Sequence, residues 1–279
     1  MAALGPKNSN VQLLSCLIDE EDTGDSEYRF LVDRQTVKYV TTAPGVFCGA
    51  EDDRTFGPIL LSELLPPFPT GNWNKGYVAK DPQTGQTAFI RTETVRLSGV
   101  ESLWHPTKLD VLEFTQKEWL RQRVHVSTHP ELGGDGAPVL VKLAVWPWEV
   151  PFMETETAIY RQIDGKGIGP RFLGHLTEGR DGRVVGFAVE WVEGARAAGP
   201  GDLGRCREAL RRLHELGIKS GDTNKHNFLV RHGHDDVVLV DFELAKQNCS
   251  PQELEAEMAT LESSLADVSF RGGVKPIRE

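Results

Sequence analysis

The stretch SGDTNKHNFLV, residues 220–230, places an aspartate, two asparagines, a lysine and a histidine directly before an apolar run. Residues 202–218 before it predict a helix, because apolar side chains recur there at helical spacing between Asp202, a suitable N-cap, and Gly217, a suitable C-cap. The runs NFLVR and VVLVDF after it, joined by HGHDD, predict a strand hairpin. The sequence therefore predicts the order helix, polar loop, strand hairpin for this part of the chain.

The hairpin brings the two ends of this region together. Asp222 and Asn227 lie before the first strand, and Asp241 lies at the end of the second. Because a hairpin folds back on itself, we expect Asp241 near Asn227. A carboxylate and an amide oxygen are ligands that Mg²⁺ accepts beside phosphate oxygens, although both residues could instead cap the hairpin. Asp222 is close enough to orient a nucleophilic hydroxyl, or it is a turn aspartate.

Two charged residues upstream belong to regular elements. Lys142 lies within VLVKLAVW, residues 139–146, a predicted strand covered on both faces. Without a partner it would be a strand lysine whose amine reaches solvent. Residues 151–163 predict a helix with both Glu154 and Glu156, and helical spacing puts Glu156 nearer the apolar face.

The order of these elements resembles that of the protein-kinase-like superfamily. The matching segments, from about residue 124 to 266, include VLVKLAV, the Glu156 helix, GIGPRFLGH, the strand and hinge AVEWVEG, SGDTNKHN and VDF. SGDTNKHN is closest to the His-Gly-Asp loops of aminoglycoside and choline phosphotransferases and of compact atypical kinases, and the chain also resembles fungal kinase-like proteins. The resemblance implies an α+β, two-lobe kinase-like fold with a short C-terminal lobe.

The resemblance also implies ATP- and Mg²⁺-dependent phosphoryl transfer to a hydroxyl of a substrate that the sequence does not identify. Lys142 would pair with the phosphates and be held by Glu156, and Asp222 would accept or orient the hydroxyl. The implied binding residues are Lys142, Glu156, Glu190 and Val192 for ATP, and Asn227 and Asp241 for Mg²⁺.

Three features depart from the family pattern. Ser220 replaces the histidine that usually supports the loop, Asp-Phe-Glu replaces Asp-Phe-Gly, and no G-x-G-x-x-G precedes Lys142. ELGGDGAP directly precedes the Lys142 strand, and TGNWNKGYV could cover phosphates only if the lobe began near Gly71. A catalytically inactive kinase-like scaffold that binds nucleotide or protein is therefore the alternative function, and an α/β domain without a nucleotide site is a third.

The composition of the chain indicates which kinds of partner and which cellular compartment to expect. The chain of 279 residues has 31 basic and 41 acidic side chains, a net charge of −10 that disfavours direct binding to nucleic acid or anionic lipid. No apolar run is long enough to span a bilayer and no secretory signal is evident, so we expect an intracellular, cytoplasmic protein without a membrane partner. The four cysteines are scattered and predict free thiols; they are Cys16, Cys48, Cys206 and Cys249.

We expect three regions: residues 1–100 as an N-terminal extension or enlarged small lobe, 101–193 as a kinase-like N-lobe ending in the hinge, and 194–279 as a short C-lobe. In the first region YRFLVD and TVKYVTT predict strands, and GYVAKDPQTGQTAFIRTETV predicts a hairpin. LPPFPTGNW, residues 65–73, predicts a linker or a rigid turn, and the acidic run 18–28 predicts a solvated loop. His232 and His234 predict a solvent-facing turn.

Overall fold

The computed structural model describes residues 7–47, 51–132, 136–231, 233 and 236–269. The predicted α+β class is confirmed, and the chain divides into two compact units, unit 1 (Met1–Leu97) and unit 2 (Ser98–Glu279). Among the described helices, none has the length and apolar character needed to cross a membrane. Cys16, Cys206 and Cys249 are free thiols, as predicted. The predictions for Cys48, His232 and His234 concern positions outside the described residues.

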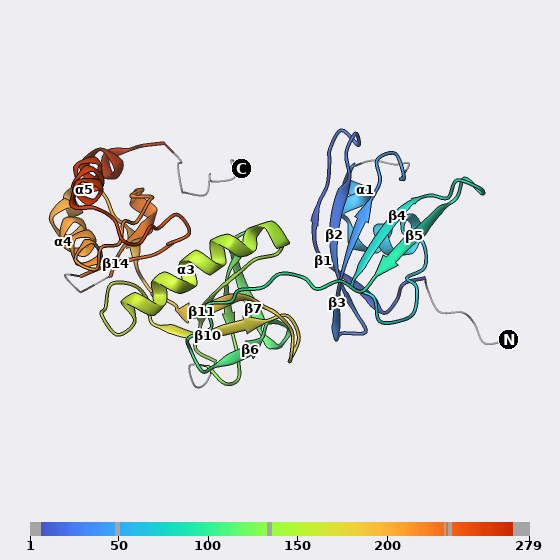
Figure 1. Ribbon diagram of the computed structural model, residues 1–279, viewed down its shortest axis with the longest axis horizontal. Coiled ribbons are helices and arrows are strands. Elements are labelled where there is room, and N and C mark those ends of the chain that lie inside the picture. Colours follow the sequence, from blue (N-terminus) through green and yellow to red (C-terminus); the bar gives the residue numbers. More distant parts are fainter. Residues whose placement is uncertain (1–6, 48–50, 133–135, 232, 234–235, 270–279) are drawn as a thin grey trace. The chain divides into compact units, whose positions relative to one another are not determined.

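Unit 1 is built on a five-stranded sheet in the order β1-β2-β3-β4-β5 (Figure 1). Neighbouring strands are antiparallel except β3 and β4, which are parallel. The two predicted strands and the predicted hairpin are confirmed as β2, β3 and β4–β5. The bounds are β1 (Val11–Leu17), β2 (Ser26–Val32), β3 (Thr36–Thr42), α1 (Glu51–Thr55), α2 (Gly57–Ile59), the π-helical turn Leu60–Leu64, β4 (Lys75–Lys80) and β5 (Thr87–Glu93).

The segment 65–73 lies inside unit 1, so its interpretation as a linker is wrong and the rigid turn is the one that holds. Leu65 and Trp73 are buried, and the ring of Phe68 packs 5.2 Å from that of Phe30 in β2. The ammonium of Lys38 donates to the carbonyl oxygen of Trp73 at 2.6 Å. Leu65, Phe68 and Trp73 therefore serve as part of the unit 1 core.

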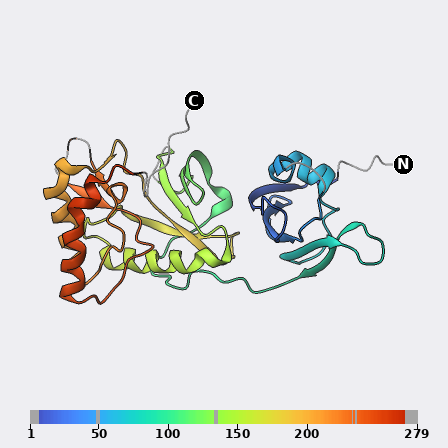
Figure 2. The same cartoon turned by 90° about the horizontal axis from the view of Figure 1, so that it is seen from above.

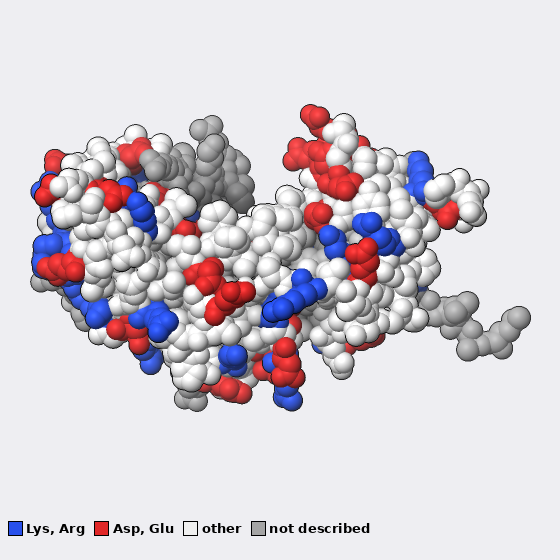
Figure 3. Space-filling view, viewed as in Figure 1, with Lys and Arg blue, Asp and Glu red and all other residues white. Residues whose placement is uncertain are grey.

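Residues 18–25 of the acidic run form the loop between β1 and β2. Glu20, Glu21 and Asp25 are exposed there, which confirms a solvated loop for this part, and acidic side chains gather at this end of unit 1 (Figure 3). For residues 26–28 the prediction is wrong, because they belong to β2, where Ser26 and Tyr28 are buried. Asp19 accepts hydrogen bonds from the backbone N–H groups of Thr23 (2.7 Å) and Gly24 (2.6 Å). These bonds hold the pKa of the Asp19 carboxyl below its usual value.

Unit 2 contains a six-stranded sheet in the order β6-β10-β11-β9-β8-β7, with helix α3 across one face (Figure 1). Strand β8 has the predicted bounds, whereas β9 ends before the predicted residue 146. The sequence did not predict β7, because six of its seven side chains are exposed and leave no apolar alternation. The bounds are β6 (Lys108–Asp110), β7 (Thr115–Arg121), β8 (Val124–Thr128), β9 (Val139–Leu143), α3 (Val150–Ile163), β10 (Phe172–Thr177) and β11 (Val184–Glu190).

The remainder of unit 2 is a three-stranded sheet, β12-β13-β14, with helices α4 and α5 side by side (Figures 1 and 2). The predicted hairpin and both predicted helices are confirmed. The bounds are β12 (Arg196–Ala197), α4 (Leu203–His214), β13 (Phe228–Val230), β14 (Val237–Leu239) and α5 (Pro251–Ala266), with 3₁₀ turns at Val111–Glu113, Pro147–Glu149, Pro200–Asp202 and Lys225–Asn227.

One hydrophobic core joins the six-stranded sheet to the helices of unit 2. The ring of Tyr160 in α3 lies 5.2 Å from that of Phe187 in β11 and 5.4 Å from that of Phe242, which follows β14. Leu210 of α4 and Leu261 of α5 are buried in the same cluster. Residues before and after AVEWVEG, the segment expected to contain a hinge, therefore pack into one compact body.

Helix α4 begins directly after Asp202, as predicted, but it ends at His214, before the predicted C-cap Gly217, and Asp202 does not cap it through its side chain. Its carboxylate instead binds the guanidinium groups of Arg196 (2.7 Å) and Arg205 (2.6 Å). The hydrogen bond from Arg196 contributes most to lowering the pKa of Asp202 to about 2. At the other end Gly217 adopts φ = +69°, which is strained for residues with a side chain.

We expect Gly186→Ala to destabilise unit 2 by about 1–3 kcal/mol, because its methyl group would overlap the carbonyl oxygen of Lys142 in the neighbouring strand β9. Gly204→Ala is the matched control, since nothing surrounds that position in α4 and alanine favours helix. Urea unfolding should show an earlier transition for Gly186→Ala alone. Equal midpoints for wild type and Gly186→Ala would contradict the tight packing of β11 against β9.

Candidate functional site

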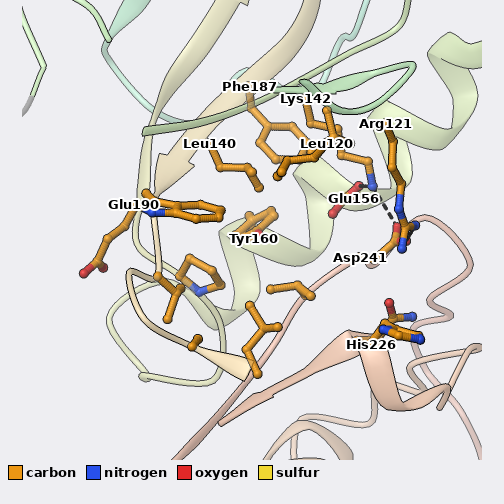
Figure 4. A pocket seen from close by; sticks show the side chains of 18 residues that line it. Leu120, Arg121, Leu140, Lys142, Glu156, Tyr160, Phe187, Glu190, His226 and Asp241 are labelled. Atoms are coloured by element: carbon orange, nitrogen blue, oxygen red, sulfur yellow. Dashed lines mark hydrogen bonds and ion pairs between the residues drawn. The ribbon is translucent and has the colours of Figure 1, made fainter. Parts of the chain in front are cut away.

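A cavity of about 240 Å³ in unit 2 is apolar at one end and charged at the other (Figure 4). Its walls come from the six-stranded sheet, α3, the hinge after β11 and the β13–β14 hairpin. The apolar lining consists of Leu120, Val124, Leu140, Tyr160, Pro170, Phe187, Trp191, Val192, Ala195, Leu229 and Val240. The polar and charged lining includes Arg121, Lys142, Glu156, His226, Asn227 and Asp241.

Lys142 is the centre of the charged end. Its side chain is 7% exposed, and its Nζ lies 2.7 Å from Glu156 Oε2, 2.7 Å from Asp241 Oδ1 and 2.9 Å from Glu243 Oε1. Burial alone would lower the pKa of Lys142, but the three carboxylates outweigh burial and raise it. Lys142 therefore stays protonated, and its stem does not carry the amine to solvent.

Helix α3 points its two candidate glutamates, Glu154 and Glu156, in different directions. Residues two apart in a helix point about 200° apart, so Glu154 and Glu156 face opposite ways. The Glu156 carboxylate faces Lys142 and also accepts a hydrogen bond from the backbone N–H of Phe242 at 3.1 Å. Glu154 instead accepts the backbone N–H of Glu101 at 2.6 Å. Burial raises the pKa of Glu156 to about 7, against the attraction of Lys142.

Asp241 follows β14 and lies beside Asn227, as the hairpin geometry led us to expect. The backbone N–H of Val240 donates to the carbonyl oxygen of Asn227 at 3.0 Å. Asp241 adopts φ = +65°, a left-handed conformation that a residue with a side chain seldom takes. Burial opposes its charge, but Lys142 outweighs burial and holds the pKa of Asp241 below its usual value. The unusual backbone aims the carboxylate at Lys142.

Asp222 does not line the cavity itself but is hydrogen-bonded to Asn227, which does. Asn227 is buried and lines the cavity, and its side-chain amide donates to the carbonyl oxygen of Asp222 at 3.1 Å. The Asp222 carboxylate accepts the side-chain amide of Asn224 at 2.8 Å and is partly exposed. The structure thus brings Lys142, Glu156, Asn227 and Asp241 to one cavity and puts Asp222 in the loop that adjoins it.

Glu190 and Val192 both line the apolar end of the cavity, where strand β11 leads into the hinge. The carboxylate of Glu190 points away from the cavity (Figure 4). Its backbone N–H donates to the carbonyl oxygen of Arg171 at 2.9 Å. Any contact of Glu190 with a ligand would therefore come from its backbone.

Helix α5 anchors the loop that carries Asp222, which the sequence did not predict. The carboxylate of Glu257 accepts the backbone N–H groups of Ser220 (2.9 Å) and Gly221 (2.7 Å) and the Nε2 of His214 (2.8 Å). Burial opposes this charge, but the three donors hold the pKa of Glu257 below its usual value. Glu257 thus orders the loop at Ser220 and Gly221.

A sequence signal for Glu257 was present. Glu257, Leu261 and Leu265 are spaced four residues apart and all three are buried on one face of α5. An acidic residue on the apolar face of a helix predicts a buried partner, because an unpaired buried carboxylate is costly.

Two arginines near the charged end were also missed, because β7 was not predicted. Arg121 ends β7 and lines the cavity. Arg123 pairs with Glu149 at 3.4 Å and with Glu243 at 2.9 Å. No sequence signal identified either arginine as part of a site.

None of the described residues of the two glycine-rich segments lines the cavity. TGNWNKGYV, residues 70–78, belongs to unit 1, and unit 2 begins at Ser98, so the condition that the lobe begin near Gly71 is not met. ELGGDGAP, residues 131–138, connects β8 to β9, and 133–135 are outside the described residues. The turn between β7 and β8, which borders the cavity through Arg121, contains no glycine.

Comparison with known proteins found no match for this chain, either among protein-family models or among curated proteins. An assignment of function therefore depends on the cavity and its residues.

We expect Glu257→Gln to loosen the loop at Ser220 and Gly221, because a neutral amide replaces the carboxylate that binds both N–H groups. Hydrogen exchange of these two amides should accelerate, and the chain should lose about 1–3 kcal/mol of stability. Glu262→Gln, also on α5 and paired only at the surface with Arg207, is the control.

The same anchor predicts a pH dependence. Because the folded pKa of Glu257 is lowered, its stabilisation is complete above the unfolded pKa of about 4.3 and is lost as pH falls through the folded value. Glu257→Gln should lack this acid-dependent loss. Exchange rates and a pH profile identical to those of wild type would show that Glu257 does not anchor the loop.

Proposed function

We propose that unit 2 is a two-lobe, kinase-like phosphotransferase that uses ATP and Mg²⁺ to phosphorylate a hydroxyl of its substrate. The observation that carries the proposal is the meeting, in one cavity, of the Lys142–Glu156 ion pair with Asn227 and Asp241. Strand β9, helix α3 and the β13–β14 hairpin contribute these residues. The six-stranded sheet with α3 would form one lobe, and the hairpin with α4 and α5 the other.

The cavity suits a nucleotide because it has an apolar end for the base and a charged end for the phosphates. Leu140, Tyr160 and Phe187 offer apolar surface for a flat base, and the hinge residues Glu190 and Val192 border that surface. The charged end, with Lys142, would receive the phosphates. Ligand sites of this kind combine an apolar wall with a few placed polar groups.

The donor chemistry at the charged end fits Mg²⁺. Asp241 and Asn227 offer a carboxylate and an amide oxygen, and the carboxylates of Glu156, Asp241 and Glu243 lie within 4.8 Å of one another. Asp241 and Asn227 would hold the ion, and the ion would neutralise charge on the phosphates. Lys142 would hold the carboxylates of Asp241 and Glu156 in position through its ion pairs with both.

Asp222 would orient the substrate hydroxyl and accept its proton. Hydrogen bonds to Asn224 fix its carboxylate, and Asn227 and the Glu257 anchor fix the loop on either side. Catalysis by such a site comes from positioning and electrostatics.

A nucleotide-binding scaffold without turnover is the second candidate. The observation that favours it is Glu243, a third carboxylate that competes with phosphates for Lys142. Both candidates predict nucleotide binding, and they differ in product formation.

Asp241→Asn should abolish any Mg²⁺-dependent gain in ATP affinity, because the main metal-binding carboxylate becomes a neutral amide. Asparagine tolerates the left-handed backbone at this position, so the fold should persist. Asp236→Asn, an exposed position of the same hairpin, is the control. Calorimetric titration with ATP, with and without Mg²⁺, measures the effect. The same Mg²⁺ dependence in Asp241→Asn and wild type would rule out Asp241 as the main ligand.

Asp222→Asn should bind ATP and Mg²⁺ as wild type does, while its turnover falls by about 10²–10⁴-fold, the usual contribution of a positioned base. ADP release from ATP, alone and with hydroxyl-bearing small molecules and proteins, measures turnover. Wild-type protein that binds ATP but releases no ADP above a heat-inactivated control would favour the scaffold. Wild-type protein that binds no nucleotide would overturn both candidates.

A further inference from the structure

Three carboxylates already surround the ammonium of Lys142. One oxygen of each of Glu156, Asp241 and Glu243 lies within 2.9 Å of its Nζ. An incoming anion would have to displace one of these oxygens to reach Lys142 directly. A second cation at the charged end would make binding of an anionic group easier.

The turn between β7 and β8 supplies such a cation. Arg121 pairs with Val124 across the hairpin, so Gln122 and Arg123 form a two-residue turn. Arg123 fixes this turn, because its guanidinium binds Glu243 at 2.9 Å and Glu149 at 3.4 Å.

The side chain of Arg121 extends along the cavity toward Asp241 (Figure 4). It is 42% exposed, and its Nη1 lies 4.0 Å from Asp241 Oδ2, a longer ion pair than any of the three around Lys142. Arg121 is thus the more accessible of the two cations that line the cavity beside Asp241.

The opposite side of the cavity mouth also carries basic residues. His226 faces Asp241 from the loop before β13 (Figure 4). Arg121 and His226 therefore both lie near Asp241 in the lining of the cavity (Figure 4).

We infer that Arg121 binds the anionic phosphate tail of the nucleotide at the cavity mouth. The turn between β7 and β8 has no glycine-rich backbone to bind phosphates, and the side chain of Arg121 would do so in its place. The inference rests on the proposed nucleotide function. A guanidinium presents paired N–H donors that match two phosphate oxygens, and such charge-assisted bonds are stronger than neutral ones. Arg121 would contact the phosphates while Lys142 remains with its carboxylates.

The test compares ATP with adenosine, which lacks the phosphates, by calorimetric titration of the full chain with Mg²⁺. Arg121→Ala should weaken ATP binding by about 10- to 100-fold and leave adenosine binding unchanged. Arg121→Lys should give an intermediate loss, because it keeps the charge and loses the paired donors. Arg207→Ala, an exposed arginine of α4, is the control. Thermal unfolding verifies that each variant is folded.

The outcomes separate this inference from the proposed function. Wild-type protein that binds neither ligand would overturn both. If wild type binds ATP and Arg121→Ala binds it equally well, the proposed function stands and the inference fails. If Arg121→Ala loses ATP and adenosine affinity equally, Arg121 shapes the cavity, and its role in phosphate binding is overturned.

Discussion

The buried ammonium of Lys142 joins three segments that are remote in the sequence: strand β9, helix α3 and the residues after β14. Removing a charge from water costs several kcal/mol, so a buried lysine and its carboxylates must meet with good geometry. That requirement fixes the rotation of α3 through Glu156 and the left-handed backbone of Asp241. Glu156 adds a second constraint by binding the backbone of Phe242, whose ring packs on Tyr160. The charged cluster and the aromatic core therefore determine each other.

A second buried carboxylate organises the loop on the other side of the cavity. Glu257 of α5 binds two successive backbone N–H groups and His214 of α4, so one side chain connects both helices to the loop. Because the bonds go to the backbone, the loop keeps its shape with serine at position 220. The position of Asp222 then follows from the packing of α5.

The two anchors leave a cavity whose ends differ in chemistry. Apolar side chains from the sheet and the hairpin form one end, while cations and carboxylates nearly balance at the other. Such a balance holds side chains in place without a ligand and allows an anion and a metal ion to enter together, because each offsets the charge of the other. Leu140 and Lys142 both line the cavity, because every second residue of β9 faces the same side.

The sequence by itself determined the regular elements whose side chains alternate or recur between strong boundary residues. Helices α4 and α5 and the β13–β14 hairpin belong to this group, and the hairpin alone placed Asp241 beside Asn227. Strand β7 was not predicted from the sequence, because it is almost entirely exposed and so lacks an alternating apolar pattern. Only the tertiary structure decided which charges meet: Ser220 and Glu257 are 37 residues apart in the chain, and Arg123 and Glu243 are 120 apart. Propensity and periodicity act over a few residues, whereas pairing of buried charges depends on how whole elements pack.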